Sequence, residues 1–291
     1  MRLVFAGTGA FAVPALRTLV EAGHAVTLVV TQPDRPAGRG LRLRPSPVKL
    51  AALDLGLPVF QPERVREEDA VQRLRDERPT AVVVAAYGQI LPASLLELAP
   101  LKSINVHASL LPRHRGPAPI AWAILLGDRE TGVTIMQMDE GVDTGPTYAQ
   151  ERVPIGPRET VSSLEARLAA SGAGLLRRTL PEIESGRLRP VPQPGAGATR
   201  ARRLTAEDGR LTPAMPADEI DRRVRALTPN PGCWIRLPQG EVKVLAGHPA
   251  ADGTSRSDPL IETPAGAYVI EELQVPGGRP MSAAAWLRGR R

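Results

Sequence analysis

The stretch SINVHASLLPRHRG, residues 103–116, joins a strand-like run to a dense group of polar side chains. Its first five residues alternate in polarity and include the β-branched Ile104 and Val106, which is typical of a β-strand. An amide, two imidazoles, a hydroxyl and two guanidiniums occur within residues 105–116 alone. Strong hydrogen-bonding groups beside a buried run cost stability unless they are paired. The stretch therefore predicts either a solvated polar loop or a built site.

Short apolar runs and helical patterns alternate on both sides of this stretch. Runs rich in valine and isoleucine predict strands, and patterns with an apolar face that end near glycine predict helices. The predicted strands are residues 3–7, 25–31, 57–60, 80–87, 103–107 and 132–138, and the predicted helices are residues 13–23, 46–56, 67–77 and 117–127. A hairpin around 143–155 and a helix over 160–186 follow. This alternation predicts an α/β fold with a Rossmann-like, mostly parallel sheet.

The composition changes at residues 187–203, where proline, glycine and arginine dominate and no periodicity survives. Because 291 residues are many for one core, we expect a first domain over residues 1–186, a linker over 187–203 and a second domain over 204–291. The second domain has one predicted helix and several short strands separated by turn residues. That pattern predicts a small, OB-like β-barrel.

Composition and charge narrow the class of protein. No apolar run approaches the roughly 20 residues that span a bilayer, and the first residues lack a signal-peptide pattern, so we expect a cytoplasmic protein. The single cysteine and the scattered histidines predict neither a disulfide nor a metal site. The net charge of +6 favours an anionic partner such as nucleic acid. The alternative explanation of the positive charge is a general bias in amino-acid composition, because nearly all the basic residues are arginine.

A glycine-containing loop, GTGAFA at residues 7–12, follows the first predicted strand and fits the relaxed dinucleotide-binding pattern G-x-G-x-x-A. That pattern also requires an acidic residue at the end of the second strand to hold a ribose. Gln32 and Pro33 stand there instead. A tight strand-to-helix turn is therefore favoured over nucleotide binding.

Residues 31–49 form a long connection with several positive side chains, namely Arg35, Arg39, Arg42, Arg44 and Lys49. The segment has no apolar period, so it is predicted as a loop without regular structure, and connections of this length are usually functional or disordered. Arginine forks suit phosphate oxygens. A phosphate-binding loop and a solvated run of charge remain equally open from composition.

Asn105 and His107 lie two residues apart on one predicted strand, so their side chains share a face. Asp139, Glu140 and Asp143 follow a later strand, and the carboxyl ends of strands are where open α/β sheets bind ligands. An amide and an imidazole can hold an oxyanion, while a carboxylate can orient the imidazole or accept a proton from an attacking amine. Turn residues and an isolated surface histidine are the alternative interpretation.

NVHASLLPRHRGPAPIAWAI and TGVTIMQMDEGVDTGP resemble two segments of the formyltransferases that use 10-formyltetrahydrofolate. The resemblance extends over essentially the whole chain. It implies that Asn105, His107 and Asp143 are the catalytic residues and that residues 1–186 form the catalytic domain. It also implies folate contacts from Ser109, Leu110, Leu111 and Pro112, with 10-formyltetrahydrofolate as formyl donor and no metal.

TQPDRPAGRG with PSPVK, RALTPNPGCWI and LQVPGGRPMSAAAWLRG resemble segments of those family members that formylate methionyl initiator tRNA. The resemblance implies that residues 204–291 bind tRNA and that the protein is a monomer. Arg200, Arg202 and Arg203 replace the family's TYA-K pattern but keep its positive charge. Two alternatives remain: a folate hydrolase or small-molecule formyltransferase with the same trio, and a non-catalytic nucleic-acid-binding protein on a Rossmann-like scaffold.

Overall fold

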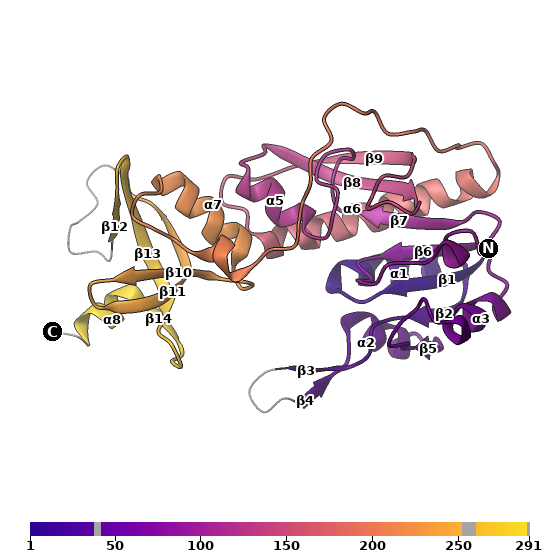
Figure 1. Cartoon of the computed structure of the whole chain (residues 1–291), viewed down its shortest axis with the longest axis horizontal. Helices are drawn as coiled ribbons and strands as arrows, with labels where there is room; N and C mark the ends of the chain where they lie inside the picture. Colours follow the sequence, from indigo (N-terminus) through magenta and orange to yellow (C-terminus); the bar gives the residue numbers. More distant parts are fainter. Residues whose placement is uncertain (38–41, 252–259, 290–291) are drawn as a thin grey trace. The chain divides into compact units, whose positions relative to one another are not determined.

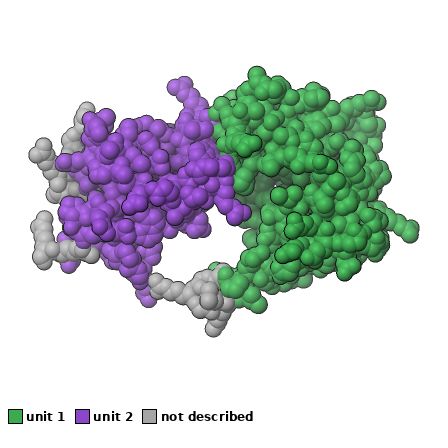
Figure 2. Space-filling model, viewed as in Figure 1, with its two compact units in different colours: residues 1–119, 130–154, 165–201 green, residues 120–129, 155–164, 202–291 purple. Residues whose placement is uncertain are grey.

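The computed structural model describes residues 1–37, 42–251 and 260–289. The chain divides into two compact units (Figure 2). Unit 1 comprises residues 1–119, 130–154 and 165–201, and unit 2 comprises residues 120–129, 155–164 and 202–291. Among the described residues, no helix combines the length and the apolar character needed to cross a bilayer.

The helices and strands follow the alternation expected from the sequence (Figure 1). The strands are β1 (Arg2–Gly7), β2 (Ala25–Val30), β3 (Arg35–Ala37), β4 (Arg42–Arg44), β5 (Val59–Phe60), β6 (Ala81–Ala85), β7 (Ser103–His107), β8 (Glu130–Gln137), β9 (Thr147–Pro154), β10 (Cys233–Leu237), β11 (Gly240–Pro249), β12 (Leu260–Thr263), β13 (Gly266–Gln274) and β14 (Pro280–Ser282). The helices are η1 (Ala10–Ala12), α1 (Val13–Glu21), α2 (Pro47–Asp54), α3 (Glu68–Asp76), α4 (Ala93–Leu96), α5 (Pro119–Leu125), α6 (Val161–Glu184), η2 (Ala206–Gly209), α7 (Ala217–Leu227) and α8 (Ala283–Arg288).

Unit 1 is built on a seven-stranded sheet in the order β5-β2-β1-β6-β7-β8-β9. The first five strands of this order are parallel, and β8 and β9 are antiparallel additions at the edge after β7. The predicted Rossmann-like, mostly parallel sheet is confirmed. The chain leaves β1 to either side, toward β2 and toward β6, which is the arrangement that places ligands at the carboxyl ends of the strands.

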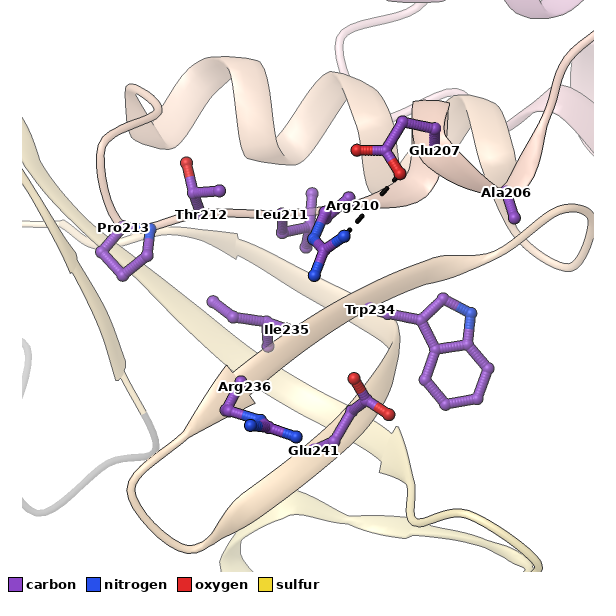
Figure 3. A pocket seen from close by; sticks show the side chains of 10 residues that line it. All are labelled: Ala206, Glu207, Arg210, Leu211, Thr212, Pro213, Trp234, Ile235, Arg236 and Glu241. Carbon is purple, nitrogen blue, oxygen red and sulfur yellow. Dashed lines mark ion pairs between the residues drawn. The ribbon is translucent and has the colours of Figure 1, made fainter.

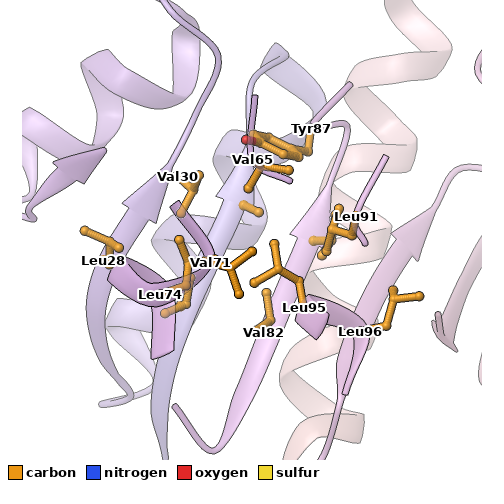
Figure 4. Packing of buried hydrophobic residues seen from close by; sticks show 13 residues of the cluster. Leu28, Val30, Val65, Val71, Leu74, Val82, Tyr87, Leu91, Leu95 and Leu96 are labelled. Carbon is orange, nitrogen blue, oxygen red and sulfur yellow. The ribbon is translucent and has the colours of Figure 1, made fainter. Parts of the chain in front are cut away.

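An apolar core covers one face of the sheet (Figure 4). Val30 of β2 and Val82 of β6 contribute to the same cluster as Leu74 of α3 and Leu95 of α4, and each of these side chains is almost fully buried. Each buried side chain of this size contributes roughly 1.5–3 kcal/mol. This layer holds β6 and the neighbouring β7 rigidly in place.

Helix α6 packs against the opposite face of β7. A Cβ atom on Gly172 would lie 2.8 Å from Cγ1 of Val106, so the helix approaches the strand as closely as a glycine allows. Val106 points away from Asn105 and His107 because side chains alternate along a strand. Ser103 shares the face of Asn105 and His107, and its hydroxyl donates to the carbonyl of Leu95 in α4. The sheet therefore presents Asn105 and His107 on the α4 side.

The glycine loop after β1 is a tight strand-to-helix turn, as predicted. A Cβ atom on Gly7 would lie within 3.0 Å of Phe5, Ala12 and Ala85, so only glycine fits at the end of β1. The chain then enters η1 and α1 directly. The glycine serves backbone packing between β1 and β6.

The prediction that residues 31–49 lack regular structure was wrong. β3 and β4 form a two-stranded antiparallel pair in which Arg35 lies opposite Arg44. Strands of three residues are too short to show an alternating pattern, and arginine and proline hide them further. Ser46 caps α2 directly afterwards by accepting a hydrogen bond from the N–H of Lys49 at 3.0 Å.

Unit 2 contains an antiparallel sheet in the order β10-β11-β13-β12, with β14 added to β13. Figure 1 shows this sheet as a strongly curled half-barrel with α7 beside it, in agreement with the predicted small β-barrel class. Irregular register in β11 near Ala246 increases the local twist. Asp221 of α7 is buried and pairs with Arg158 at 3.0 Å and Arg225 at 2.6 Å, which attaches residues 155–164 to this unit.

Candidate active site

His107 and Asp143, which are 36 residues apart in the sequence, come together in unit 1. Nδ1 of His107 lies 3.5 Å from Oδ1 of Asp143, and the two side chains are 6% and 16% exposed. This separation is long for a hydrogen bond, but catalytic contacts are often loose without substrate and tighten in the complex. The carboxylate can therefore orient the imidazole and stabilise positive charge on it.

The other ring nitrogen of His107 also faces an acceptor. Nε2 lies 3.1 Å from the main-chain carbonyl of His114, a residue that is 2% exposed and has a φ of +58°. Both nitrogens of the ring thus point at oxygens, and only an imidazolium could donate to both at once. Donation to a substrate oxyanion therefore requires the ring to share or exchange one of these contacts.

Asn105 is buried on the same strand, β7, and its side chain lies on the same face as that of His107. Its amide makes no hydrogen bond to another residue within the described ranges. Asn105 is therefore free to donate to a substrate at this position.

The carboxyl end of β8 does not bring an acidic residue to His107, although this was expected from the sequence. β8 runs antiparallel to β7, with Gln137 beside Ile104 and Thr134 beside His107, so its carboxyl end lies at the far end of β7. The β8–β9 connection, residues 138–146, instead runs back to bring Asp143 to His107. Asp143 has a φ of +54°, which is uncommon for a residue with a side chain.

The three predicted acids of this connection have different environments. Asp139 stabilises the turn itself, accepting hydrogen bonds from the Thr144 hydroxyl at 2.7 Å and from the Gly141 N–H at 3.1 Å. Glu140 is exposed. Asp143 alone of the three faces His107, and its Oδ2 also accepts a hydrogen bond from the Gly116 N–H at 2.8 Å.

The residues predicted to contact folate form the turn after β7. The Ser109 hydroxyl donates to the carbonyl of Arg113 at 2.6 Å, so it supports the turn. The N–H of Leu111 donates to the Thr134 hydroxyl at 3.2 Å, and its carbonyl accepts from Gln150 at 2.7 Å. Leu110 and Pro112 are half-buried, whereas Ser109 and Leu111 are buried. Their folate role remains a prediction, with Leu110 and Pro112 the more accessible pair.

Residues 187–201 pass close to the site as part of unit 1. Val191 exchanges two main-chain hydrogen bonds of 2.8 Å with Thr147. The N–H of Arg115 donates to the carbonyl of Thr199 at 2.9 Å, and that of Ala201 donates back to the Arg115 carbonyl at 2.7 Å. The same segment supplies Gln193, which contacts the main chain of Asp143. Sequence reasoning missed Gln193 because it lies in an aperiodic, proline-rich stretch.

The positive residues of the 31–49 connection are placed as follows. Arg35 and Arg44 are exposed and directly opposite each other in the β3–β4 pair, and like charges in that position repel. Lys49 is paired with Asp34 at 2.7 Å, and hydrogen bonds from Lys49 and Gln61 lower the pKa of Asp34. Arg42 lies in β4, and Arg39 lies outside the described residues.

The predicted basic group at residues 200–203 is partly engaged within unit 2. Arg202 forms a two-pronged ion pair with Asp208 and lies 5.1 Å from the ring of Trp122. This contact holds the pKa of Asp208 at about 2. Arg200, in unit 1, and Arg203, in unit 2, have exposed side chains. Arg200 and Arg203 are therefore the better candidates for contacts to phosphate.

Unit 2 also has a surface pocket of about 540 Å³ between η2 and the β10–β11 hairpin (Figure 3). Arg210 and Arg236 line it together with Glu207 and Glu241, and Arg210 lies 3.8 Å from Glu207. The lining has charges of both signs, so it does not by itself select an anion. Trp234, at its edge, lies 5.8 Å from the ammonium group of Lys243.

Comparison with known proteins identifies the class of enzyme to which this fold belongs. A family model described as formyl transferase matches residues 1–180, and one described as formyl transferase, C-terminal domain, matches residues 203–291. The chain belongs to the formyl transferase family.

Curated relatives match along nearly their whole length. The methionyl-tRNA formyltransferase of Halorhodospira halophila is 50% identical over 302 residues, covering 100% of this chain and 96% of the relative. That of Symbiobacterium thermophilum is 44% identical, covering 99% of this chain and 92% of the relative. The family assignment therefore extends to both units.

Two solved structures share the fold at low sequence identity. HypX from Aquifex aeolicus in complex with tetrahydrofolic acid aligns with a TM-score of 0.70 and 17% identity over 99% of this chain, which spans 47% of that protein. The N-formyltransferase from Helicobacter canadensis with folinic acid and dTDP-3-aminofucose aligns with a TM-score of 0.67 and 18% identity, covering 93% of this chain and 98% of that one. These similarities concern the fold alone.

Proposed function

We propose that this chain transfers a formyl group from 10-formyltetrahydrofolate to the α-amine of methionine on initiator tRNA, as a cytoplasmic enzyme of translation initiation. The observation that carries the proposal is the 50% identity to a methionyl-tRNA formyltransferase over 96% of that relative's length. The match includes the C-terminal unit as well as the catalytic one. A similarity restricted to residues 1–180 would support only a formyl transfer of some kind.

Asn105 and His107 would stabilise the tetrahedral intermediate. The methionyl amine attacks the formyl carbon, and the carbonyl oxygen becomes an oxyanion. The amide N–H of Asn105 lacks another described partner, and His107 lies on the same face of β7. Two such donors in a buried site supply the kind of stabilisation expected of an oxyanion hole, where one donor contributes roughly 3–4 kcal/mol.

Asp143 would act through His107 and on the attacking amine. At 3.5 Å its carboxylate can orient the imidazole, and it can accept the proton that the amine loses as the new C–N bond forms. The oxyanion then reforms the carbonyl as the bond between the formyl carbon and folate N10 breaks, and N10 leaves as a neutral amine with the proton that Asp143 accepted. The chain's own groups therefore supply both oxyanion stabilisation and proton transfer.

The folate would lie against the turn at residues 109–112. Half-buried Leu110 and Pro112 can cover a flat ring, while the turn holds them in place through Thr134 and Gln150. A tetrahydrofolate complex among proteins of the same fold is consistent with a folate donor. The assignment of these four residues remains a proposal.

Exposed positive side chains would hold the tRNA. Arg35 and Arg44 repel each other across the β3–β4 pair, and a phosphate bound between them would relieve that repulsion. We propose that Arg39, Arg42 and Lys49, residues 200, 202 and 203, and the C-terminal residues 204–291 also contact the tRNA. The chain would act as a monomer.

The test is a formyl-transfer assay with 10-formyltetrahydrofolate and charged initiator methionyl-tRNA, charged elongator methionyl-tRNA or no tRNA. Formylation of the initiator alone is expected. Folate deformylation in all three reactions without formylmethionine would make the protein a hydrolase and refute the proposal. His107→Ala is expected to lower kcat about 100-fold or more with little change in KM. A wild-type kcat in this variant would refute the role of His107.

A further inference from the structure

The side chain of Gln193 joins the two loops that form the candidate active site. Its Nε2 donates to the main-chain carbonyls of Asp143 at 2.9 Å and Gly145 at 2.7 Å. Its Oε1 accepts hydrogen bonds from Nε and Nη2 of Arg115 at 3.0 and 2.7 Å. The amide therefore uses both of its donors and both lone pairs. A flipped amide would place its N–H groups against the guanidinium, so the chemistry of the partners fixes its orientation.

The position of Asp143 depends on an unusual main-chain conformation. With a φ of +54°, Asp143 lies in the left-handed region, which costs of order 1 kcal/mol for a residue with a side chain. This conformation turns the carboxylate toward His107 and the Gly116 N–H. Gln193 binds the carbonyl of Asp143 itself, so it stabilises the conformation from which the carboxylate reaches His107.

The segment that carries Gln193 is attached without this side chain. Main-chain hydrogen bonds fix Val191 to Thr147 on one side of Gln193 and Thr199 to Arg115 on the other. Loss of the Gln193 side chain should therefore leave residues 187–201 in place. The main-chain hydrogen bonds are enough to hold residues 187–201. The four hydrogen bonds of the Gln193 side chain instead restrain the loop that carries Asp143.

We propose that Gln193 is a positioning residue that holds the Asp143 main chain and so sets the carboxylate beside His107. This inference rests on the proposed function for its kinetic consequence. Gln193 affects the reaction rate by way of Asp143, which it contacts only at the main-chain carbonyl. Gln193 thus controls the geometry of the catalytic pair and not the binding of either substrate.

The experiment compares full-length Gln193→Ala and Gln193→Glu with wild type and with Gln72→Ala, a change at an exposed glutamine on α3. Gln193→Glu keeps an acceptor for Arg115 but replaces the two N–H donors with an oxygen that repels both carbonyls. We expect both Gln193 variants to lower kcat about 10- to 100-fold, the range that a small misplacement of a catalytic group produces. KM for methionyl-tRNA and folate should stay near wild type.

The second measurement is the proton chemical shift and the solvent-exchange rate of the Gly116 main-chain N–H, observed by NMR in isotope-labelled full-length protein. Its hydrogen bond to Asp143 should weaken in both Gln193 variants, which would move the proton signal upfield and speed its exchange with solvent. Gln72→Ala should leave kcat and the Gly116 signal unchanged. A merely structural role for Gln193 would lower the melting temperature without altering the Gly116 signal.

The inference is overturned if either Gln193 variant keeps wild-type kcat, or if kcat falls while the Gly116 signal stays as in wild type. The experiments can refute this inference and the proposed function independently of each other. Wild-type protein that forms no formylmethionyl-tRNA would refute that function, while the Gly116 signal would still show whether Gln193 positions Asp143. An unchanged signal would then overturn the inference on its own.

Discussion

Replacing Asp143 with asparagine removes a charge from the site and leaves its shape nearly unchanged. Asparagine tolerates the left-handed conformation that Asp143 adopts, and its side-chain oxygen can still accept the hydrogen bond from the Gly116 N–H. Asp143→Asn therefore tests the carboxylate's two proposed roles together, its charge beside His107 and its acceptance of the amine proton.

The size of the effect follows from the 3.5 Å between Asp143 Oδ1 and His107 Nδ1. Two unit charges at that separation attract by about 5 kcal/mol at an effective dielectric constant of about 20. Since about 1.4 kcal/mol is a factor of ten in rate, an imidazolium in the transition state would lose at most about 10³-fold in kcat. Asp143 is 16% exposed, and screening by solvent reduces this limit. We expect a fall in kcat of about 10²- to 10³-fold.

The assay is formyl transfer at saturating initiator methionyl-tRNA and 10-formyltetrahydrofolate, together with urea unfolding of each variant. Asp143→Asn should fold with nearly wild-type stability and keep its KM values. Asp143→Ala should show a similar fall in kcat and lose about 1 kcal/mol of unfolding free energy, because the Gly116 N–H loses its acceptor.

Asp139→Asn is the matched control, because Asp139 lies in the same connection but bonds Thr144 and not His107. It should retain wild-type kcat. The reasoning fails if Asp143→Asn retains wild-type kcat, or if the Asp139 variant loses as much activity as the Asp143 variant.

Two further predictions concern charge outside the catalytic pair. The hydrogen bonds and charge of Arg202 hold the pKa of Asp208 at about 2, below its ordinary 3.8, so this pair stabilises the fold above about pH 4 and the contribution disappears between pH 4 and 2. Because solvent screens this pair, Asp208→Asn should lose about 1 kcal/mol in urea unfolding at pH 7 and much less near pH 2, and equal stability at pH 7 would contradict this. The double change Arg35→Ala and Arg44→Ala should weaken binding of initiator tRNA and lower the slope of log affinity against log salt by up to about two, with kcat preserved. A salt dependence like that of wild type would show that neither residue contacts phosphate.

The parallel sheet could be predicted because its strands are buried on both faces and therefore read as short valine-rich runs. The same rule fails for β3 and β4, whose three-residue strands are exposed at Arg35 and Arg44. Pairing there depends on register, which leaves no periodic signal in so few residues. The pairing of β3 with β4 could therefore be recognised only in the structure.

The shared face of Asn105 and His107 on β7 could also be predicted, because side chains alternate along a strand and these residues are two positions apart. The spacing of residues left the choice among Asp139, Glu140 and Asp143 open, and only the family resemblance singled out Asp143. Each follows the same apolar strand, and only main-chain geometry distinguishes an acid that stabilises its own turn from one that faces a histidine. The local sequence gives only the residue types, whereas the orientation of an acid toward His107 depends on the φ angle of Asp143.

The antiparallel direction of β8 explains why the site needs support from a distant segment. The carboxyl end of β8 lies beside Ile104, three residues and about 10 Å along β7 from His107. The β8–β9 connection must therefore run back along the strand, and it does so with Asp143 in a conformation of positive φ. A connection of this kind has little apolar burial to hold it, so hydrogen bonds must restrain it. Gln193 supplies two of them from a residue 50 positions later in the chain, and this is why an aperiodic segment that resembles a linker belongs to the catalytic unit.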